Sequence, residues 1–377
     1  HLLLFHRKFV QQLKWFTEAE YTQIVAFSQI LPGPSSSQVG IAMGYLKNGY
    51  RGSICAWLGF SLPSCVVMTL AAILGQHYFN QISAVFFHVI QLVVLAIVIG
   101  AFWHMLHSFC KDIWQYVFML LSALFIYSSA VSYSQLIVIL FAALLGLVLS
   151  PRTQSKKTHT RVSQSPLSKT THKNHHQHQS YTQNESYKQY QKPYIWLVLF
   201  VLPFLFFSLF NDAAASSVIQ SCRGLYLSAS MVFGGGHILL PLLHQEFVTT
   251  GMIANQQFNL GYALAQLMPG PLFSFASYLG ALLPFTQFAV LNALIATLLI
   301  FLPSFLLIWG TLPYWSWLMR QQRIGQALNG INAAIIGLLL SLVIQMAEKS
   351  GLSGADLIFI GLVVVLLRTQ ISMVLIL

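Results

Sequence analysis

Long apolar runs alternate with short polar segments along most of this 377-residue chain. A helix rises about 1.5 Å per residue, so about 20 apolar residues span the roughly 30 Å hydrocarbon layer of a membrane. Runs that approach or exceed this length lie at residues 52–75, 82–105, 113–130, 132–149, 194–211, 286–309, 325–347 and 355–377. The pattern predicts an all-α polytopic membrane protein embedded in the lipid bilayer.

One polar segment, residues 151–193, separates the apolar runs into two sets. It is rich in Ser, Thr, Gln, His and Lys and has almost no aliphatic residues with which to build a core. We therefore expect a flexible linker between an N-terminal repeat at 1–150 and a C-terminal repeat at 194–377. Four of its histidines cluster: His172, His175, His176 and His178. A solvated tract explains them more simply than a metal site, and we predict neither a metal nor a cofactor.

The two sets of apolar runs repeat each other in sequence. Residues 29–34 are Gln-Ile-Leu-Pro-Gly-Pro and residues 266–271 are Gln-Leu-Met-Pro-Gly-Pro, and the same offset pairs Tyr21 with Phe258. A second motif follows at nearly the same offset in both halves: Leu62-Pro63-Ser64 and Leu302-Pro303-Ser304. A chance match of this length around two prolines is rare, so we infer that the chain arose by duplication.

The composition narrows the class of protein. Charged residues make up 7% of the chain, against about 25% in soluble domains, so they could not cover a water-facing surface of this size. The net charge is +11, but eight of the 19 Lys and Arg residues lie in the linker and the others are scattered. This distribution argues against a soluble enzyme and against a continuous surface for nucleic acid.

The positions of Lys and Arg predict the orientation, because cytoplasmic loops of membrane proteins keep positive charge. With the linker inside the cell, all the basic residues but two are cytoplasmic: Lys349 is external and Arg223 lies within the membrane. The first Pro-Gly-Pro then lies between two cytoplasmic lysines, whereas the second lies between external loops without Lys or Arg. The second half is therefore inverted relative to the first, as in many transporters. We expect a multi-pass protein of the cytoplasmic (inner) membrane.

Each Pro-Gly-Pro divides a stretch that is too short to cross a membrane. In the first half, the flanking segments 17–31 and 35–46 would span about 22 and 18 Å as helices. Proline removes a backbone donor and glycine allows a sharp reversal, so we predict re-entrant helical hairpins broken at Pro32, Gly33 and Pro34 and at Pro269, Gly270 and Pro271. The helix that starts after each break offers free N–H groups to an anion. A simple packing kink is the alternative.

The side chains around these breaks are the candidate substrate-binding residues. They are Gln29, Ser35, Ser36, Ser37 and Gln38 in the first copy, and Gln266, Ser274 and Ser277 in the second. The serines add hydroxyl donors to the start of each new helix. Each Gln that precedes a break by one turn could contact the substrate or cap the neighbouring half-helix.

A run of glycines and one arginine extend the candidate site. The residues Gly234, Gly235, Gly236 and His237 end a short apolar stretch at 218–233 and would expose backbone amides at a further break. Tight helix packing or a simple turn is the alternative. Arg223 lies within that stretch, where a charge is costly and by default functional, so we predict a counter-charge for an anion. The alternative interpretation is that the Arg223 side chain extends its guanidinium to the external membrane interface.

The sequence carries no motif for enzymatic chemistry. It contains no HExxH, GxSxG, Walker or Rossmann pattern. Its cysteines have no paired spacing and are interpreted as small apolar residues: Cys55, Cys65, Cys110 and Cys222. We therefore predict that the protein is not an enzyme and that any transport is secondary.

These motifs resemble the chromate ion transporter family of bacterial membrane proteins, in its two-domain form. In the first half the resemblance rests on Ser28-Gln29-Ile30-Leu31-Pro32-Gly33-Pro34, Gly44-Tyr45 and Gly59-Phe60-Ser61-Leu62-Pro63-Ser64. In the second half it rests on Phe233-Gly234-Gly235-Gly236-His237, Glu246-Phe247-Val248, Gly261-Tyr262, Gln266-Leu267-Met268-Pro269-Gly270-Pro271 and Asn329-Gly330-Ile331-Asn332-Ala333-Ala334. It covers nearly the whole chain apart from the linker.

The resemblance implies two antiparallel homologous halves, export of chromate from the cytoplasm, and chromate resistance. The family's first half begins with a helix that ends in Phe-Gly-Gly, and this chain begins at His1, where that motif would just have ended. We therefore expect the first helix to be missing. The residues by themselves predict only an anion, so sulfate or another tetrahedral oxyanion stays an alternative substrate. A further alternative is a non-transporting membrane sensor or metal-binding scaffold that uses the linker. For the oligomeric state, the candidate is a homodimer.

Overall fold

The computed structural model describes residues 1–78, 81, 83–129, 134–150, 192–209, 216–233, 236–318 and 321–368. The predicted linker lies almost entirely outside these residues, and so does its histidine cluster. Within the described ranges the regular structure is helical throughout. The predicted all-α class is therefore confirmed, whereas the predicted boundaries of the repeats and the linker stay a prediction.

The first half contains two short N-terminal elements and five longer helices. They are α1 (Leu2–Phe5), the π-helical turn η1 (His6–Gln12), α2 (Glu18–Ile30), α3 (Ser35–Tyr78), α4 (Ala84–Phe109), α5 (Ile113–Ser128) and α6 (Ser134–Leu149). The long helix α3 is two helices joined at Asn48 and Gly49, whose backbone angles are not helical. The short segment predicted after the first Pro-Gly-Pro is the part of α3 that precedes this joint.

The second half repeats this order after one extra helix. Its elements are α7 (Tyr194–Ser208), α8 (Ser217–Ser230), η3 (Gly236–Ile238), α9 (Leu239–Leu243), η4 (His244–Val248), α10 (Asn255–Leu267), η5 (Leu272–Ser274), α11 (Phe275–Leu282), α12 (Ala289–Thr311), η6 (Leu312–Tyr314), α13 (Trp315–Leu318), α14 (Gln322–Ser350) and α15 (Gly354–Arg368). The hairpin formed by α10, η5 and α11 corresponds to α2 and the start of α3. The helices α12 and α14 then correspond to the rest of α3 and to α4.

In the described part of the chain, four helical segments are long and apolar enough to cross a membrane: α3, α4, α12 with η6, and α14. The other predicted spans form shorter apolar helices, namely α5, α6, α7 and α15. The outer face of α3 shows why the solvent is lipid: Leu62, Val66, Leu70 and Leu74 follow one another at every fourth residue and are 54%, 50%, 53% and 57% exposed. Such an apolar stripe would be unfavourable in water and suits hydrocarbon.

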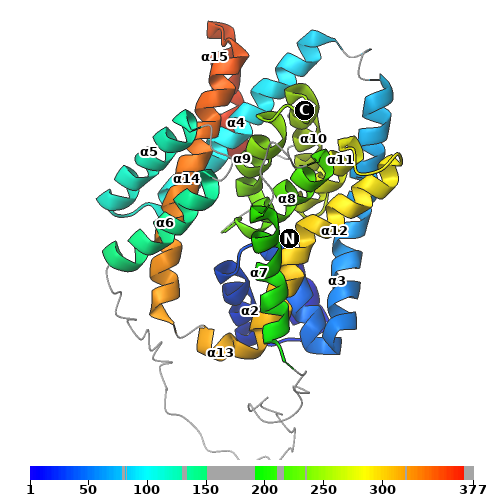
Figure 1. The fold of residues 1–377 in the computed structure, drawn as a ribbon, viewed down its shortest axis with the longest axis vertical. Coiled ribbons are helices and arrows are strands. Elements are labelled where there is room, and N and C mark those ends of the chain that lie inside the picture. Colours follow the sequence, from blue (N-terminus) through cyan, green and yellow to red (C-terminus); the bar gives the residue numbers. More distant parts are fainter. Residues whose placement is uncertain are drawn as a thin grey trace, which may run out of the picture.

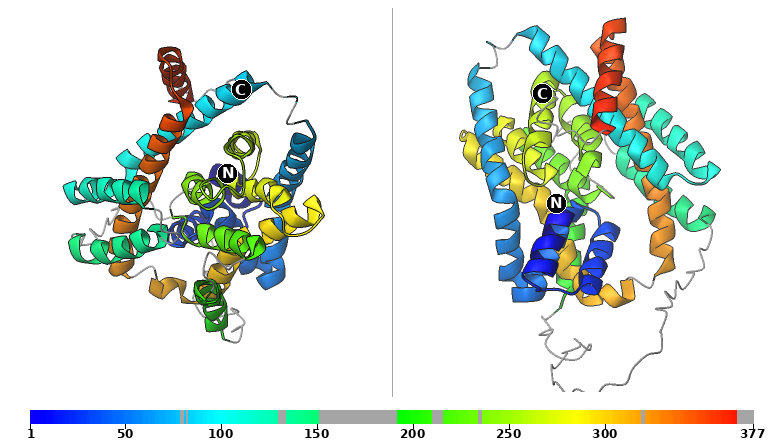
Figure 2. Two further views of the ribbon diagram at one scale, coloured as in Figure 1. Left: turned by 45° about the horizontal axis from the view of Figure 1, so that its top comes forward. Right: turned by 180° about the vertical axis from the view of Figure 1, so that it is seen from behind.

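The two halves run in opposite directions. In Figure 1, α2 and the start of α7 lie at one end of the molecule and the α10–α11 hairpin lies toward the other, and the reverse view in Figure 2 agrees. The equivalent helices α3 and α12 are antiparallel. The Trp309 indole N–H, near the end of α12, donates to Ser53 Oγ at 3.2 Å, and Ser53 lies near the start of the part of α3 that follows Gly49. The prediction of two inverted halves with broken helices is confirmed.

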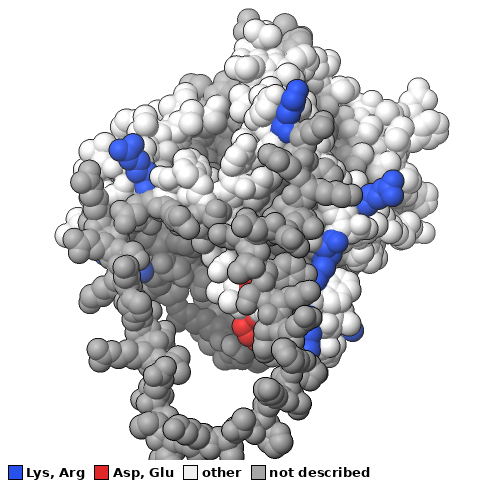
Figure 3. Space-filling view, turned by 90° about the horizontal axis from the view of Figure 1, so that it is seen from below, with Lys and Arg blue, Asp and Glu red and all other residues white. Residues whose placement is uncertain are grey.

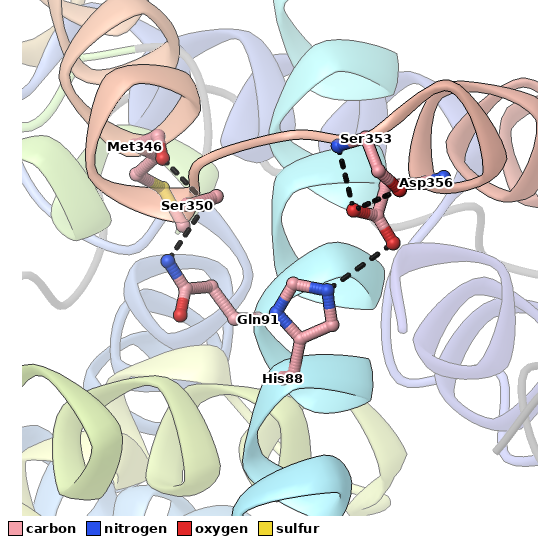
Figure 4. Close-up of polar contacts among 6 residues, drawn as sticks. All are labelled: His88, Gln91, Met346, Ser350, Ser353 and Asp356. Atoms are coloured by element: carbon pink, nitrogen blue, oxygen red, sulfur yellow. Dashed lines mark hydrogen bonds and ion pairs between the residues drawn. The ribbon is translucent and has the colours of Figure 1, made fainter.

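A polar contact fixes the second antiparallel pair, α4 and α14. Near the start of α4, Gln91 Nε2 donates to Ser350 Oγ at 2.7 Å, at the end of α14, and His88 Nε2 lies 3.2 Å from Asp356 Oδ1 at the start of α15 (Figure 4). Figure 3 shows the opposite end, viewed from below, where Lys and Arg side chains stand apart from one another. The basic residues visible at this end do not form one continuous patch, as their scatter in the sequence predicts.

The helices α6 and α14 approach each other through glycines. A methyl group at Gly330 would meet the carbonyl oxygen of Ala142, and one at Gly146 would meet the carbonyl oxygen of Gln326. Small residues permit such backbone contact between helices in membranes, where close packing replaces the hydrophobic effect as the source of association.

We expect Gly330→Ala to destabilise the protein by about 1–3 kcal/mol, because the added methyl must push two backbones apart. Thermal unfolding in detergent, followed by size-exclusion chromatography, measures the loss. Gly325→Ala is the matched control on the same helix, since an added methyl there meets nothing within 4 Å. Equal unfolding temperatures for the two variants would contradict the packing described here.

Candidate functional site

The first hairpin turn is fixed by backbone geometry and by one glutamine. A capping box between Thr17 and Glu20 starts α2, which ends at Ile30 before the turn. Gly33 has φ +131°, a conformation that side-chain-bearing residues rarely adopt. Across the turn, Gln38 Nε2 donates to the carbonyl of Pro32 at 2.6 Å. The carbonyl freed by the break is therefore satisfied by the helix that follows it.

The second hairpin turn repeats the backbone geometry with different side chains. Gly270 has φ +159°, and η5 begins two residues later. The Ser277 hydroxyl donates to the carbonyls of Ser274 at 2.7 Å and Cys65 at 3.1 Å, which ties α11 to α3. The other predicted polar residue of this half, Gln266, hydrogen-bonds the buried Tyr262 hydroxyl.

Each turn is seated on a serine of the opposite half. A methyl group at Gly33 would lie 2.6 Å from the hydroxyl oxygen of Ser304 on α12, and one at Gly270 would lie 2.5 Å from the hydroxyl oxygen of Ser64 on α3. These two serines end the repeated Leu-Pro-Ser motifs, so the contact is reciprocal. Only glycine leaves room for such close approach at both turns.

The contacts between α3 and α12 place the two turns near each other. Trp57 packs on Phe305 with ring centroids 5.5 Å apart, and Cys65 lies beside Thr297. Because the helices are antiparallel, Ser64 and Ser304 are offset by six residues along the pair, about 9 Å at 1.5 Å per residue. The turns that they hold therefore contact the α3–α12 pair at positions about 9 Å apart along it.

The segment that carries the glycine run joins the two turns. The Gly33 N–H donates to the carbonyl of Val232 at 2.6 Å, directly before the run. At the other end of the run, a methyl group at Gly236 would lie 3.2 Å from Leu272 Cβ, just after the second turn. Gly234, Gly235 and the side chain of His237 lie outside the described part of the chain.

Several hydroxyls around the turns are buried without a hydrogen-bond partner. The unpartnered atoms here are Ser28 Oγ, Ser37 Oγ, Gln38 Oε1, Ser61 Oγ, Ser274 Oγ and Ser304 Oγ. A buried polar group without a partner is costly, so a cluster of them calls for a ligand or water. Hydroxyls and amide N–H groups can donate to an anion without placing a fixed negative charge beside it.

Not every predicted residue lies in this cluster. Gln29 is exposed, because it occupies the outer face of α2. Arg223 is buried, at 7% exposed, so its side chain is not extended to the membrane surface. It precedes the end of α8 by seven residues, about 10 Å along the helix, and therefore lies away from the turns. Its neighbour Gly224 packs on Glu246, whose Cβ is 3.1 Å from the position of an added methyl.

Sequence reasoning treated Ser64 and Ser304 as part of a repeated motif and did not include them among the binding residues. The signal was present, since Leu-Pro-Ser recurs in both halves at nearly the offset of Pro-Gly-Pro. What the sequence does not give is the cross-pairing, in which each motif contacts the other half. Among the described residues, no group of three or more His, Cys, Asp or Glu side chains could hold a metal ion.

The inverted repeats, the broken helices and the membrane spans together define a multi-pass membrane transporter. The family comparison identifies its kind: the chromate transporter family model matches residues 1–147 and 219–377. The chain belongs to the chromate transporter family. Both matched regions include a Pro-Gly-Pro hairpin and a Leu-Pro-Ser helix, so the match covers the two halves that the structure relates.

Individual relatives agree with this assignment. A probable chromate transport protein of Synechococcus elongatus is 25% identical, over 92% of this chain and 79% of its own length. A chromate transport protein of Pseudomonas aeruginosa is 24% identical, over 92% and 76%. An uncharacterized transporter of Methanocaldococcus jannaschii is 23% identical, over 90% and 77%. No solved structure is significantly similar to this chain.

We expect Gly33→Ala to destabilise the first turn by about 1–3 kcal/mol, the usual cost of a strained backbone, and to displace Ser304. Gly59→Ala on α3 is the control, since its added methyl meets nothing within 4 Å. Thermal unfolding in detergent measures the difference between them. An unfolding temperature for Gly33→Ala that matches wild type would show that the turn does not need glycine.

Proposed function

We propose that this chain is a secondary transporter that exports chromate across the cytoplasmic membrane and so confers chromate resistance. The observation that carries the proposal is the reciprocal seating of two broken-helix turns on Ser64 and Ser304, among buried hydroxyls without partners. The names of the relatives from Synechococcus and Pseudomonas support chromate as the substrate.

The oxyanion would bind between the two turns. Its oxygens would accept hydrogen bonds from the hydroxyls of Ser37, Ser274 and Ser304, and from the N–H groups that start α3 and follow the second turn. The positive ends of these short helices favour a negative charge. Arg223, about 10 Å along α8 from its end, would act at longer range by attracting the anion into the membrane.

Transport would follow from the inverted architecture. Each half presents its hairpin from an opposite end of the molecule (Figure 1), so rocking one half against the other exposes the shared site to one side at a time. With the linker in the cytoplasm, the first hairpin would enter from the cytoplasmic side and the second from outside. The negative membrane potential inside a cell would itself favour the outward movement of a dianion.

Chromate and sulfate are both tetrahedral dianions, and hydroxyls and amides bind either. Cells that produce the protein should accumulate less chromate than cells with an empty vector, provided that the protein is detected in the membrane. Equal accumulation would contradict export. In vesicles, competition by excess sulfate distinguishes the two substrates: strong inhibition of chromate flux would favour a general oxyanion transporter.

We expect Ser304→Ala to raise the KM for chromate about tenfold or more, because a hydrogen bond to a charged group contributes about 1.5–3 kcal/mol. Flux measurements in vesicles over a range of chromate concentrations test this. Ser221→Ala is the matched control, since Ser221 is equally buried but its hydroxyl already donates to the carbonyl of Ser217 at 2.8 Å. A KM that is unchanged in Ser304→Ala would remove this hydroxyl from the site.

A further inference from the structure

A π-helical turn precedes the hairpin in both halves. In the first half it is η1, which begins at His6, and in the second it is η4, which begins at His244. The sequences match as His6-Arg7-Lys8-Phe9-Val10 and His244-Gln245-Glu246-Phe247-Val248. π-Helical turns are rare and are frequent at functional sites, so a pair of them in equivalent places indicates a shared role.

The two histidines have equivalent surroundings. The ring of His6 meets the ring of Tyr21 edge-on at 5.4 Å, and the ring of His244 meets the ring of Phe258 edge-on at 5.5 Å. Tyr21 and Phe258 are themselves equivalent in the two hairpins. Each histidine thus lies at the base of its hairpin, against the first helix that leads to a Pro-Gly-Pro turn.

The partner of each histidine differs in charge. His6 Nε2 lies 2.6 Å from Glu18 Oε2, at the first residue of α2. The first residue of α10 is Asn255, whose side chain lies beside His244. An amide therefore replaces the carboxylate in the second half, and nothing at this position neutralises a charged imidazole.

His244 is also buried, while one of its nitrogens has no partner. The side chain is 2% exposed and Nε2 makes no hydrogen bond. It lines a cavity of about 10 Å³, close to the room that one water needs, together with Gln135, Gln245, Ser341 and Gln345. A buried nitrogen with a lone pair, beside a polar cavity, is a proton acceptor.

A larger cavity lies next to this small one. A cavity of about 290 Å³ shares Ile126, Gln245 and Gln345 with it and extends between α5, η4 and α14 to Ser129, Thr249, Glu348 and Lys349. The end of α14 lies opposite the end at which α7 begins (Figure 1). The larger cavity therefore lies toward the end of the molecule opposite the start of α7, and it adjoins the small cavity at His244.

The charges that face His244 come from three neighbouring elements. On α14, Lys349 opposes a positive imidazole, and the adjacent Glu348 accepts a hydrogen bond from Tyr127 of α5 at 2.9 Å. On its own turn, Glu246 packs on α8 at Gly224, next to Arg223. The α10 residues beside His244 are Asn255 and Phe258, and neither carries a charge. Burial and the charge of Lys349 thus both favour the neutral imidazole in this conformation.

We propose that His244 is a proton-binding site that is loaded through these two cavities from the end of the molecule opposite the start of α7. The imidazole binds a proton that comes from bulk solvent through the cavities and releases it to solvent by the same route. An imidazolium requires water or a counter-charge, so proton binding favours conformations in which η4 moves and the cavity opens at the base of the α10–α11 hairpin. If the chain transports chromate as proposed above, protonation of His244 should make the flux depend on pH, and this consequence rests on the proposed function.

The first test follows histidine protonation itself by NMR of the full chain in detergent, over roughly pH 4–8, the range in which histidines titrate. A titrating signal that disappears in His244→Gln identifies the site. Asn255→Asp restores the carboxylate of the first half, and we expect it to move the midpoint up by about 1–3 pH units. Absence of a titrating signal, or an unmoved midpoint in Asn255→Asp, would overturn the proposal.

The second test measures chromate flux in proteoliposomes as the pH changes on one side. Wild type and His104→Gln, whose histidine is exposed on α4, should keep the pH response, and His244→Gln should lose it while still moving chromate. A full pH response in His244→Gln counts against the proposal. If wild type moves no chromate, the proposed function fails, and the NMR titration still decides the proton site. If His244→Gln does not fold, Asn255→Asp decides by the shift of its response.

Discussion

The structure depends on one reciprocal contact, in which each Pro-Gly-Pro turn packs on the Leu-Pro-Ser helix of the opposite half. A broken helix exposes backbone groups that lipid cannot satisfy, so it must be covered by protein or by a water-filled cavity. Here the cover for Gly33 is Ser304 of the second half, and the cover for Gly270 is Ser64 of the first. Neither hairpin is therefore complete within its own repeat, which explains why the two halves form one unit.

The same contact brings the chemistry to the centre of the molecule. Ser64 on α3 and Ser304 on α12, which each hold one turn, are offset by about 9 Å along these two antiparallel helices. Both halves contribute buried hydroxyls without hydrogen-bond partners to this region. The carbonyl of Val232, just after α8, accepts a hydrogen bond from the Gly33 N–H and so links this segment to the first turn. A site made in this way changes whenever the two halves move relative to each other. Alternating access thus needs no separate gate in the hairpins themselves.

The pseudo-symmetry is broken where the two sides of a membrane differ. The first hairpin begins with Glu18, beside a partly exposed His6, whereas the second begins with Asn255, beside a buried His244. The tyrosine of one half is a phenylalanine in the other. The core contacts of the repeats are kept, but the polar groups at their bases have diverged, which is expected if each base meets a different compartment.

The sequence by itself determined the helical class, the duplication, the inverted orientation and the positions of both breaks, because hydrophobic length, repeated prolines and scattered charges are properties of the chain read in order. It also pointed to the serines that follow each break. Only the tertiary structure decided which groups meet: it buried Ser304 beside Gly33, left Gln29 on an outer face, and placed Arg223 within the protein away from the turns. The physical reason is that these outcomes depend on how two antiparallel helices cross, and contacts between residues more than 200 positions apart leave no periodic trace in the sequence.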